Sequence, residues 1–458
     1  MLRKTLIRVL LISFFAGLSC IAASQESANT NKSSYQNKID SLLEYLSSNN
    51  KLMGSVTIVK GGSIVYEKAV GYSEISTNIR KIPDVLTKYR IGSISKMFTS
   101  VMIFQLLEEG KISFDVHLSK FFPDLPNSDK ITIGNLLNHH SGLFNITNDS
   151  TYSRWDTLPK TEAEILRIIK NYKPVFQSGE KGEYSNTNYI LLGYIIEKIT
   201  GKTYSEELND RVVNKIGLQN TYYGHKIDAN NNEAFSYSFW NDKWEQSKET
   251  DMSIPRGAGA VISTPEDLTK FIYALFNGKL ISQASLNHMT TMKDNFGMGI
   301  FPISFYDKKG FGHTGGIDGF VSNLEYFPDD SVAIAFCTNG LNYNMNQVLI
   351  GILSCFYDKP YSFPSFKIVN IPVNELNKYE GIYTSPILNL KITIKRDGNV
   401  LTAQATNQSA FPLSAVSETQ FVFDAAGITI DFTKQGTGKA GEFYLKQNGG
   451  RFLFTRDK

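Results

Sequence analysis

The sequence predicts an α+β fold: an α/β sandwich in which an antiparallel β-sheet is flanked by helices and a helical subdomain, followed by a small antiparallel β-barrel. Three observations support this prediction. β-Branched runs occur early (54–72) and late (319–340), helical spacing dominates between them, and the last part of the chain alternates apolar and polar residues. Early and late strands can pair in one sheet that carries the intervening helices on its faces.

The composition indicates a globular protein with more than one domain. The chain has 458 residues, of which 41% are hydrophobic and 20% charged, and its formal charge is +3. Arg3, Lys4 and Arg8 account for this whole net charge, so the rest of the chain is neutral. Proteins that bind nucleic acid present basic clusters. We therefore expect no nucleic-acid partner.

Residues 1–24 have the features of a signal peptide. Basic residues precede the apolar run 9–17, and small residues follow it. The run is too short for a comfortable membrane span. We therefore expect an exported protein, periplasmic or extracellular, without a stable membrane span. Cys20 leaves a lipid anchor open, although the residues before it fit the usual lipoprotein box poorly.

The first folded domain is expected at 35–360. Apolar spacing predicts a helix at 35–46, and the β-branched runs predict a hairpin that turns at Gly61-Gly62. A largely buried helix of about four turns should follow Ser93 and end at Gly110. Each of these elements belongs to the sandwich.

The second half of this domain is expected to return to the sheet. Thr264 and Pro265 have the residue types of a helix N-cap and first turn. Two strands should flank the turn at 328–330, and a helix should close the domain at 344–357. Cys337 and Cys355 fall in this strand and helix. Buried free thiols are favoured, and a disulfide between them stays open in an oxidising compartment.

A second domain is expected at 368–458, beyond Pro360 and Pro364. Its strands alternate strictly, with turns at Asp397-Gly398, Gly427 and Asn448-Gly449. About eight short strands in such a length predict a small β-barrel. The segment has no nucleophile–base pair, so we expect an accessory role for it.

The chemistry is expected at Ser93 and Lys96, although the pattern Ser-x-x-Lys also occurs at Ser48 and Ser178. A serine hydroxyl needs a nearby base, and positions i and i+3 share one face of a helix. Burial lowers the pKa of a lysine and makes it a base. Only Ser93 precedes a long buried helix, so context favours this pair over the other two.

A second element is Tyr184, followed by Ser185-Asn186. A tyrosine flanked by lysines can have a lowered pKa and transfer protons. The alternative is a buried tyrosine that caps the following helix. The third element is His313-Thr314-Gly315-Gly316, where the glycines allow a substrate to approach a strand edge closely.

Together these elements resemble the serine beta-lactamase and penicillin-binding protein family, in the branch of class C beta-lactamases, D-aminopeptidases and esterases. The resemblance covers about 35–357 and includes the segments NHHSGL (138–143), RGAGAVISTPEDL (256–268) and FGMGI (296–300). The tail resembles the lipocalin-like barrel that some members carry.

The resemblance implies a role for each matched residue. Ser93 would be the acylated nucleophile, Lys96 its base and Tyr184 a general acid/base. Asn186 and the strand His313-Thr314-Gly315 would bind the substrate. The backbone N–H groups of Ser93 and Gly316 would form the oxyanion hole, which stabilises charge on the attacked carbonyl.

His313 departs from the family pattern, because many penicillin-recognising relatives have a lysine there. Histidine is mostly neutral near pH 7 and should gain a proton below about pH 6. We therefore expect poor beta-lactam turnover at neutral pH and better use of carboxylate substrates in acid. His139 and His140 suggest a metal site only weakly, because adjacent side chains seldom reach one ion. We expect no metal and no cofactor.

The leading hypothesis is an exported serine hydrolase that acts through an acyl-enzyme on peptide-like amides, such as D-amino-acid peptides or cell-wall (peptidoglycan) fragments. A carboxylesterase that uses the same site is the first alternative. A non-catalytic sensor of beta-lactams or muropeptides is the second. Substrate and oligomeric state stay open at this point.

Overall fold

The computed structural model describes residues 32–457, apart from 241, 362, 434–437 and 448–449. The predicted signal peptide with Cys20 and the predicted turn at Asn448-Gly449 therefore lie outside the described residues. The division into domains at 35–360 and 368–458 stays a prediction.

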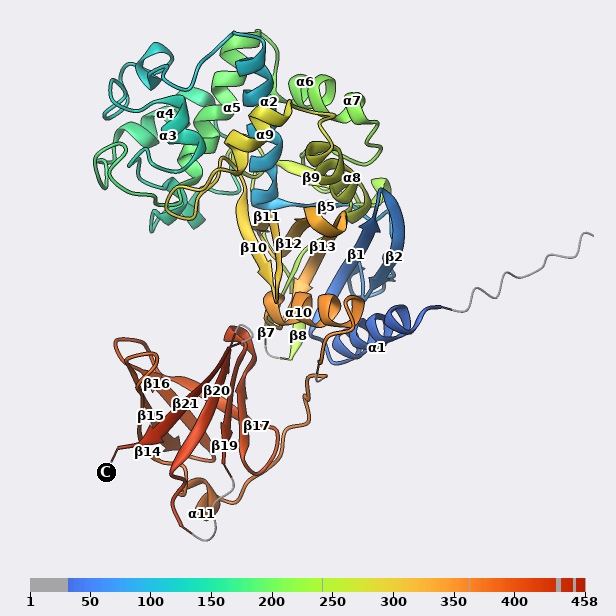
Figure 1. The fold of residues 1–458 in the computed structure, drawn as a ribbon, viewed down its shortest axis with the longest axis vertical. Helices are drawn as coiled ribbons and strands as arrows, with labels where there is room; N and C mark the ends of the chain where they lie inside the picture. Colours follow the sequence, from blue (N-terminus) through green and yellow to red (C-terminus); the bar gives the residue numbers. More distant parts are fainter. Residues whose placement is uncertain (1–31, 241, 362, 434–437, 448–449, 458) are drawn as a thin grey trace, which may run out of the picture.

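A large β-sheet forms the centre of the N-terminal part (Figure 1). Its main strands are β1 (Leu52–Lys60), β2 (Ser63–Val70), β10 (Phe301–Phe305), β11 (Lys308–Ile317), β12 (Phe320–Phe327) and β13 (Val332–Leu341). They lie in the order β10-β11-β12-β13-β1-β2, and all neighbours on this path are antiparallel. β1 pairs with β13 along its whole length, which confirms the predicted pairing of early and late strands.

Shorter strands complete the N-terminal part. They are β3 (Glu74–Ile75), β4 (Arg80–Lys81), β5 (Tyr89–Arg90), β6 (Tyr222–Tyr223), β7 (Tyr237–Trp240), β8 (Lys243–Gln246) and β9 (Val261–Ser263). β5, β9 and β6 form a small sheet of their own, and β7 joins the large sheet through β13. β5 matters for the site because Ser93 follows it directly.

Helices cover both faces of the large sheet. Those packed on it or close to it are α1 (Ser34–Ser48), α2 (Ser95–Glu108), α8 (Pro265–Phe276), α9 (Gln283–Thr290) and α10 (Met345–Phe356). Along β13, Ile334 and Phe336 join a core with α1 and α10, whereas Ala335 and Cys337 join the core with α2 and α8. Alternate side chains of one strand therefore fill two separate hydrophobic cores.

A helical subdomain lies beyond one end of the sheet (Figure 1). Its helices are α3 (Ile133–Leu137), α4 (Glu162–Lys170), α5 (Asn186–Thr200), α6 (Tyr204–Leu208) and α7 (Asn214–Ile216). α2 is buried from Ser95 to Leu106, so neighbours pack around its whole circumference. Its first turn thereby reaches the boundary between subdomain and sheet.

Local predictions from the sequence are confirmed. The Thr264 side chain accepts a hydrogen bond from Asp267 N at 3.2 Å, and Pro265 begins α8. Gly110 has φ +68° and follows the end of α2. Cys337 and Cys355 are free and buried, and they lie in the cores on opposite faces of the sheet.

A closed β-barrel ends the chain, as predicted. Its strands are β14 (Gly381–Ser385), β15 (Leu390–Asp397), β16 (Val400–Ala405), β17 (Phe411–Ala415), β18 (Gln420–Phe423), β19 (Ile428–Phe432), β20 (Glu442–Gln447) and β21 (Gly450–Arg456), and the short helix α11 (Val373–Leu376) precedes them. β14 pairs with β21 and closes the sheet. Apolar side chains inside it form a third core.

Candidate active site

Ser93 lies at the beginning of the buried helix α2. It belongs to the short 3₁₀ turn η1 (Gly92–Ile94), which connects β5 to α2. Lys96 follows in the first turn of α2, and its Nζ lies 2.9 Å from Ser93 Oγ. The i, i+3 spacing therefore brings the two side chains into hydrogen-bond contact.

Lys96 is surrounded by acceptors. Its Nζ lies 2.7 Å from Asn186 Oδ1 and 2.7 Å from the carbonyl oxygen of Ala258. Burial lowers the pKa of Lys96 well below its ordinary value of 10.5. A neutral amine has two N–H donors and one lone pair, and these two acceptors can use only the donors. The lone pair then faces Ser93, whose hydroxyl can donate to it.

Tyr184 completes the contact set around Ser93. Its hydroxyl donates to Ser93 Oγ at 2.8 Å, and Lys96 Nζ lies 4.9 Å above its ring. Burial raises the pKa of Tyr184 above its ordinary value of 10, so the expected lowering was wrong. The nearby Lys181 forms an ion pair with Glu183 at 2.9 Å instead. Tyr184 therefore keeps its proton at neutral pH.

The two other Ser-x-x-Lys matches form no such pair. Lys51 forms an ion pair with a carboxylate of the barrel at 2.9 Å, and the Ser48 hydroxyl donates to its own helix at 3.1 Å. The Ser178 hydroxyl donates to an asparagine side chain at 2.9 Å, and Lys181 is ion-paired as described above. Both lysines therefore contact carboxylates and not the serine of their own pattern.

Asn186 begins α5 and is already engaged on both sides of its amide. Its Oδ1 faces Lys96, and its Nδ2 donates to Thr147 Oγ1 at 3.0 Å. It also lines the cleft in which Ser93 lies. The expected contact with a substrate amide would therefore compete with Thr147, and in this structure Asn186 holds Lys96 in place.

In the described part of the chain, one edge of β11, beside Ser93, has no neighbouring strand over part of its length. β10 pairs with β11 as far as Phe301 opposite Gly312, so among the described residues no strand covers this side of His313-Thr314-Gly315. Thr314 is exposed, whereas His313 and Gly315 are buried on the other face. An extended ligand segment could therefore lie along this open edge.

His313 is too deeply buried to act as the expected pH switch. Burial, helped by Lys96, lowers the pKa of His313 to about 3, and its Nδ1 lies 2.5 Å from the carbonyl oxygen of Thr314. The predicted gain of a proton below about pH 6 was wrong, because it assumed a solvated imidazole. His313 stays neutral over the pH range 5–8.

Glycines let the segment before Ser93 lie directly against β11. A Cβ on Gly92, which has φ +50°, would lie 2.8 Å from Gly316 N. A Cβ on Gly315 would lie 2.0 Å from the carbonyl oxygen of Ile91. Only glycine fits such contacts. Ser93 and Gly316 consequently line the same cleft, which has a volume of about 620 Å³.

Several residues of the site were not found from the sequence. His139 packs under Tyr184 with ring centroids 4.5 Å apart and accepts a hydrogen bond from Ser185 N at 3.2 Å. From the sequence, His139 was considered only as a weak candidate for a metal ligand. Ala258 lies in the segment 256–268 that contributes to the resemblance and Thr147 in a short 3₁₀ turn, but neither was singled out from the sequence as a contact of the site.

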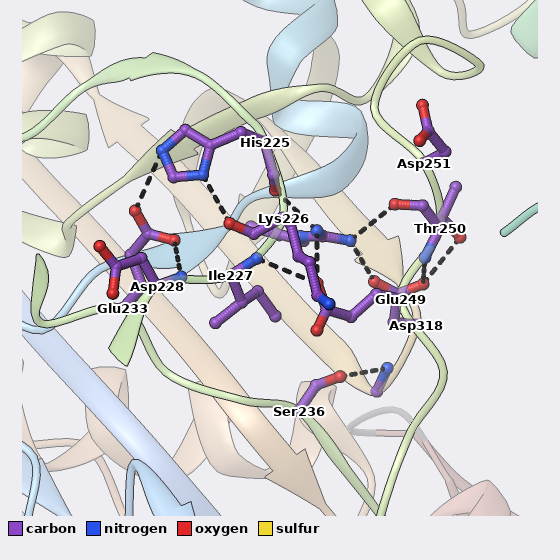
Figure 2. Close-up of polar contacts among 12 residues, drawn as sticks. His225, Lys226, Ile227, Asp228, Glu233, Ser236, Glu249, Thr250, Asp251 and Asp318 are labelled. Carbon is purple, nitrogen blue, oxygen red and sulfur yellow. Dashed lines mark hydrogen bonds and ion pairs between the residues drawn. The ribbon is translucent and has the colours of Figure 1, made fainter. Parts of the chain in front are cut away.

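A buried arginine, Arg90, links several segments that form one wall of the cleft. Arg90 donates to Asp318 Oδ2 at 2.9 Å and to Glu249 Oε2 at 3.2 Å, and it also donates to the carbonyl oxygens of Thr250 and His225. Figure 2 shows Asp318, Glu249 and Thr250 gathered around this network. Because Asp318 follows β11 and Arg90 precedes Ser93, the ion pair joins the two segments that form the site.

Replacing Asp318 by alanine should destabilise the protein. We expect Asp318→Ala to lower the free energy of unfolding by about 3 kcal/mol, because it leaves a buried guanidinium without its best partner. Urea unfolding of the full chain measures this change. Glu245→Ala, an exposed carboxylate of the same cleft, should change the free energy by less than about 0.5 kcal/mol. Equal effects of the two substitutions would contradict the structural role of the ion pair.

Comparison with known proteins identifies the family. A sequence model of the family described as "Beta-lactamase" matches residues 41–350. The chain belongs to the beta-lactamase family. It is a serine hydrolase of the beta-lactamase and penicillin-binding-protein type, as the sequence resemblance implied, and the predicted fold class is confirmed.

Curated relatives of this beta-lactamase-family chain include two bacterial proteins. Penicillin-binding protein 4* of Bacillus subtilis is 25% identical over 92% of this chain and 100% of its own length. Teichoic acid D-alanine hydrolase of Staphylococcus aureus is 28% identical over 71% of this chain and 79% of its own length. Among solved structures, D-amino acid amidase from Ochrobactrum anthropi, complexed with L-phenylalanine amide, superimposes with a TM-score of 0.65 at 25% identity, over 71% of this chain and 99% of that one.

Two further features bear on the predicted surroundings of this hydrolase. Among the described residues, no helix combines the length and the apolar character needed to cross a membrane. Within the same residues, no group of three or more histidine, cysteine, aspartate or glutamate side chains is arranged to hold a metal ion. His140 instead lies 2.9 Å from Asp294, away from the partners of His139.

Proposed function

We propose that this hydrolase cleaves amide bonds of D-amino-acid amides or peptides through an acyl-enzyme on Ser93. The observation that carries the proposal is the contact of Ser93 Oγ with both Lys96 and Tyr184. One partner is a buried lysine with a lowered pKa and the other is a phenol with a raised pKa. A base and an acid therefore meet at one hydroxyl, which is the arrangement that acyl transfer requires.

Acylation begins when Lys96 takes the Ser93 proton and Oγ attacks the carbonyl carbon. Tyr184 then gives its proton to the leaving nitrogen as the C–N bond breaks. The resulting tyrosinate lies close to the Lys96 ammonium, because Nζ is 4.9 Å from the ring centroid. This opposite charge stabilises the phenolate in a water-poor site.

Deacylation reverses the proton movements. The Tyr184 phenolate, a strong base because its pKa is raised, takes a proton from water as the water oxygen attacks the ester carbonyl. Ser93 Oγ leaves and recovers a proton from Lys96, so both catalytic groups return to their starting states. The N–H groups of Ser93 and Gly316 would hold the developing oxyanion in each step.

The substrate class rests on charge and on the relatives. Burial keeps His313 neutral near pH 7 and lowers the pKa of Lys96 well below its ordinary value, so the inner part of the site disfavours a buried cation that could pair with a substrate carboxylate. Three similar proteins have names that refer to penicillin, D-alanine on teichoic acid or a D-amino acid amide. We infer that residues 1–24 direct export, so the substrates would be envelope or extracellular compounds such as peptidoglycan fragments.

A substrate panel tests this proposal. The full mature chain should hydrolyse D-alaninamide faster than L-alaninamide, and it should hydrolyse penicillin G poorly. D-alanine methyl ester is intrinsically more reactive than D-alaninamide. A kcat/KM for the ester that exceeds the value for the amide by more than this difference in reactivity would favour the carboxylesterase. Efficient turnover of penicillin G alone would contradict the proposed function.

A further inference from the structure

The active-site cleft contains a carboxylate that has no partner. Asp156 lines the same cleft as Ser93, and its Oδ1 is enclosed by protein without a hydrogen bond. Neither of its oxygens forms an ion pair or hydrogen bond with any residue in the described part of the chain. Protein covers Oδ1, so Oδ2 is the oxygen that a ligand in the cleft can reach, and an unpaired carboxylate in a substrate cleft requires an explanation.

Two hydrogen bonds fix the backbone of Asp156, whose side chain lines the cleft. Its N–H donates to the carbonyl oxygen of Tyr152 at 3.0 Å, and its own carbonyl oxygen accepts from Asp251 N at 2.8 Å. Burial, Asp156 and Asp318 raise the pKa of Tyr152, which places both carboxylates near this ring. A ligand group between them would meet two carboxylates and an aromatic ring.

The charges of the lining residues favour a cation there. Asp156, Glu245, Asp318 and Lys248 are the charged side chains that line the cleft. Asp318 is neutralised by Arg90 at 2.9 Å, which leaves Asp156 as the enclosed carboxylate whose charge is free. Lys248 is exposed and forms no ion pair with a described residue. Glu245 is paired with Lys243 at 2.9 Å, so Asp156 is the carboxylate of this lining that has no cationic partner among the described residues.

We propose that Asp156 binds the protonated amine of the substrate, so that the enzyme selects acyl groups with a free α-ammonium over N-acylated ones. This inference rests on the proposed function, since it assigns the acyl-group preference of the Ser93 site. A primary ammonium has three N–H donors and a positive charge. It can bond Asp156 Oδ2 and lie against the Tyr152 ring, which attracts cations through its face.

A metal ion fits this position less well. Within the described residues no cluster of three metal-binding side chains exists, and Asp318 is already engaged by Arg90 and Thr250. A single available carboxylate is a poor site for a divalent ion but a sufficient one for an ammonium group.

A protection experiment tests the inference without depending on turnover. A fluorophosphonate carries no amine and reacts with the activated serine. D-phenylalaninamide and N-acetyl-D-phenylalaninamide are each added to protect Ser93 from labelling. The measured quantity is the concentration of each compound that halves the labelling rate. A charge-assisted contact is worth about 1.5–3 kcal/mol, which corresponds to about 10- to 100-fold in affinity. The free amine should protect at a concentration lower by this factor.

Substitutions then locate the contact. Asp156→Asn keeps the shape of the side chain and should reduce the ratio of the two concentrations by about 10-fold or more, with little change for the N-acetyl compound. Glu245→Gln removes the same charge from an exposed position and should leave the ratio within about 2-fold. Thermal unfolding of each variant confirms that the fold is intact.

The outcomes separate this inference from the proposed function. A ratio near one in the wild type, or a ratio that Asp156→Asn leaves unchanged while Ser93 is still labelled, would overturn the role of Asp156 alone. An equal fall of the ratio in Asp156→Asn and Glu245→Gln would also overturn this role. It would show that the overall negative charge of the cleft attracts the amine, without a specific contact to Asp156. Failure of the fluorophosphonate to label Ser93 would instead overturn the proposed nucleophile.

Discussion

Ser93→Ala is expected to abolish amide hydrolysis and labelling by a fluorophosphonate, with a loss of about 10⁴-fold or more in kcat. Ser93 Oγ is the atom that both Lys96 and Tyr184 contact, so its removal leaves the base and the acid without a nucleophile. Initial rates with D-alaninamide and intact-protein mass spectrometry measure the two effects. The variant should unfold at the wild-type temperature, because a half-buried hydroxyl contributes little packing.

Matched serines provide the control for this prediction. Ser48→Ala and Ser178→Ala alter the two other Ser-x-x-Lys patterns, in which each lysine already forms an ion pair with a carboxylate. Both variants should retain activity and labelling. Labelling that persists in Ser93→Ala and moves to another serine would show that the nucleophile lies elsewhere.

Lys96→Met should lower kcat/KM by about 10²- to 10⁴-fold and remove the acid limb of its pH profile. Burial lowers the pKa of Lys96, so the base is neutral above this lowered pKa and becomes an ammonium as the pH falls through it. Activity therefore rises with pH and reaches a plateau below pH 10.5, the ordinary lysine value. The pH dependence of kcat/KM in the wild type and the variant measures this limb.

Tyr184→Phe and Lys181→Met complete this comparison. Tyr184→Phe should lose about 10²-fold or more but keep the acid limb, because Lys96 still titrates. Lys181→Met should change little, since Lys181 is exposed and forms an ion pair with Glu183. An acid limb that survives in Lys96→Met would assign it to another group and refute the role of Lys96.

The fold could be predicted because its signals are local or periodic. The hairpin at Gly61-Gly62, the cap of α8 and the alternation in the barrel each follow from neighbouring residues. The pairing of β1 with β13 followed from the layer rule, since apolar strands need a partner. The position at which β10 stops covering β11 could not be predicted, because it depends on a register that no short pattern encodes.

The main residues of the candidate site could be predicted from the sequence, but not all of their pKa values could. Ser93 and Lys96 meet through helical spacing, and Tyr184 was assigned through the resemblance. The depth of burial is not visible in a sequence, so the lowered pKa expected for Tyr184 and the ordinary pKa expected for His313 were both wrong. Asp156 lies in an irregular segment, and its vacant oxygen becomes apparent only when all its neighbours are placed.

Trapping the acyl-enzyme shows whether Ser93 is the residue that becomes acylated. The Tyr184→Phe variant lacks the group that activates water, and 4-nitrophenyl acetate has a leaving group that needs no acid, so acylation should outrun deacylation. Peptide mass spectrometry after a rapid acid quench locates the acetyl group. We expect an acetyl ester on Ser93 that is absent from the Ser93→Ala, Tyr184→Phe double variant. An acetyl group on a different residue, or turnover of the ester with Ser93 unmodified, would contradict it.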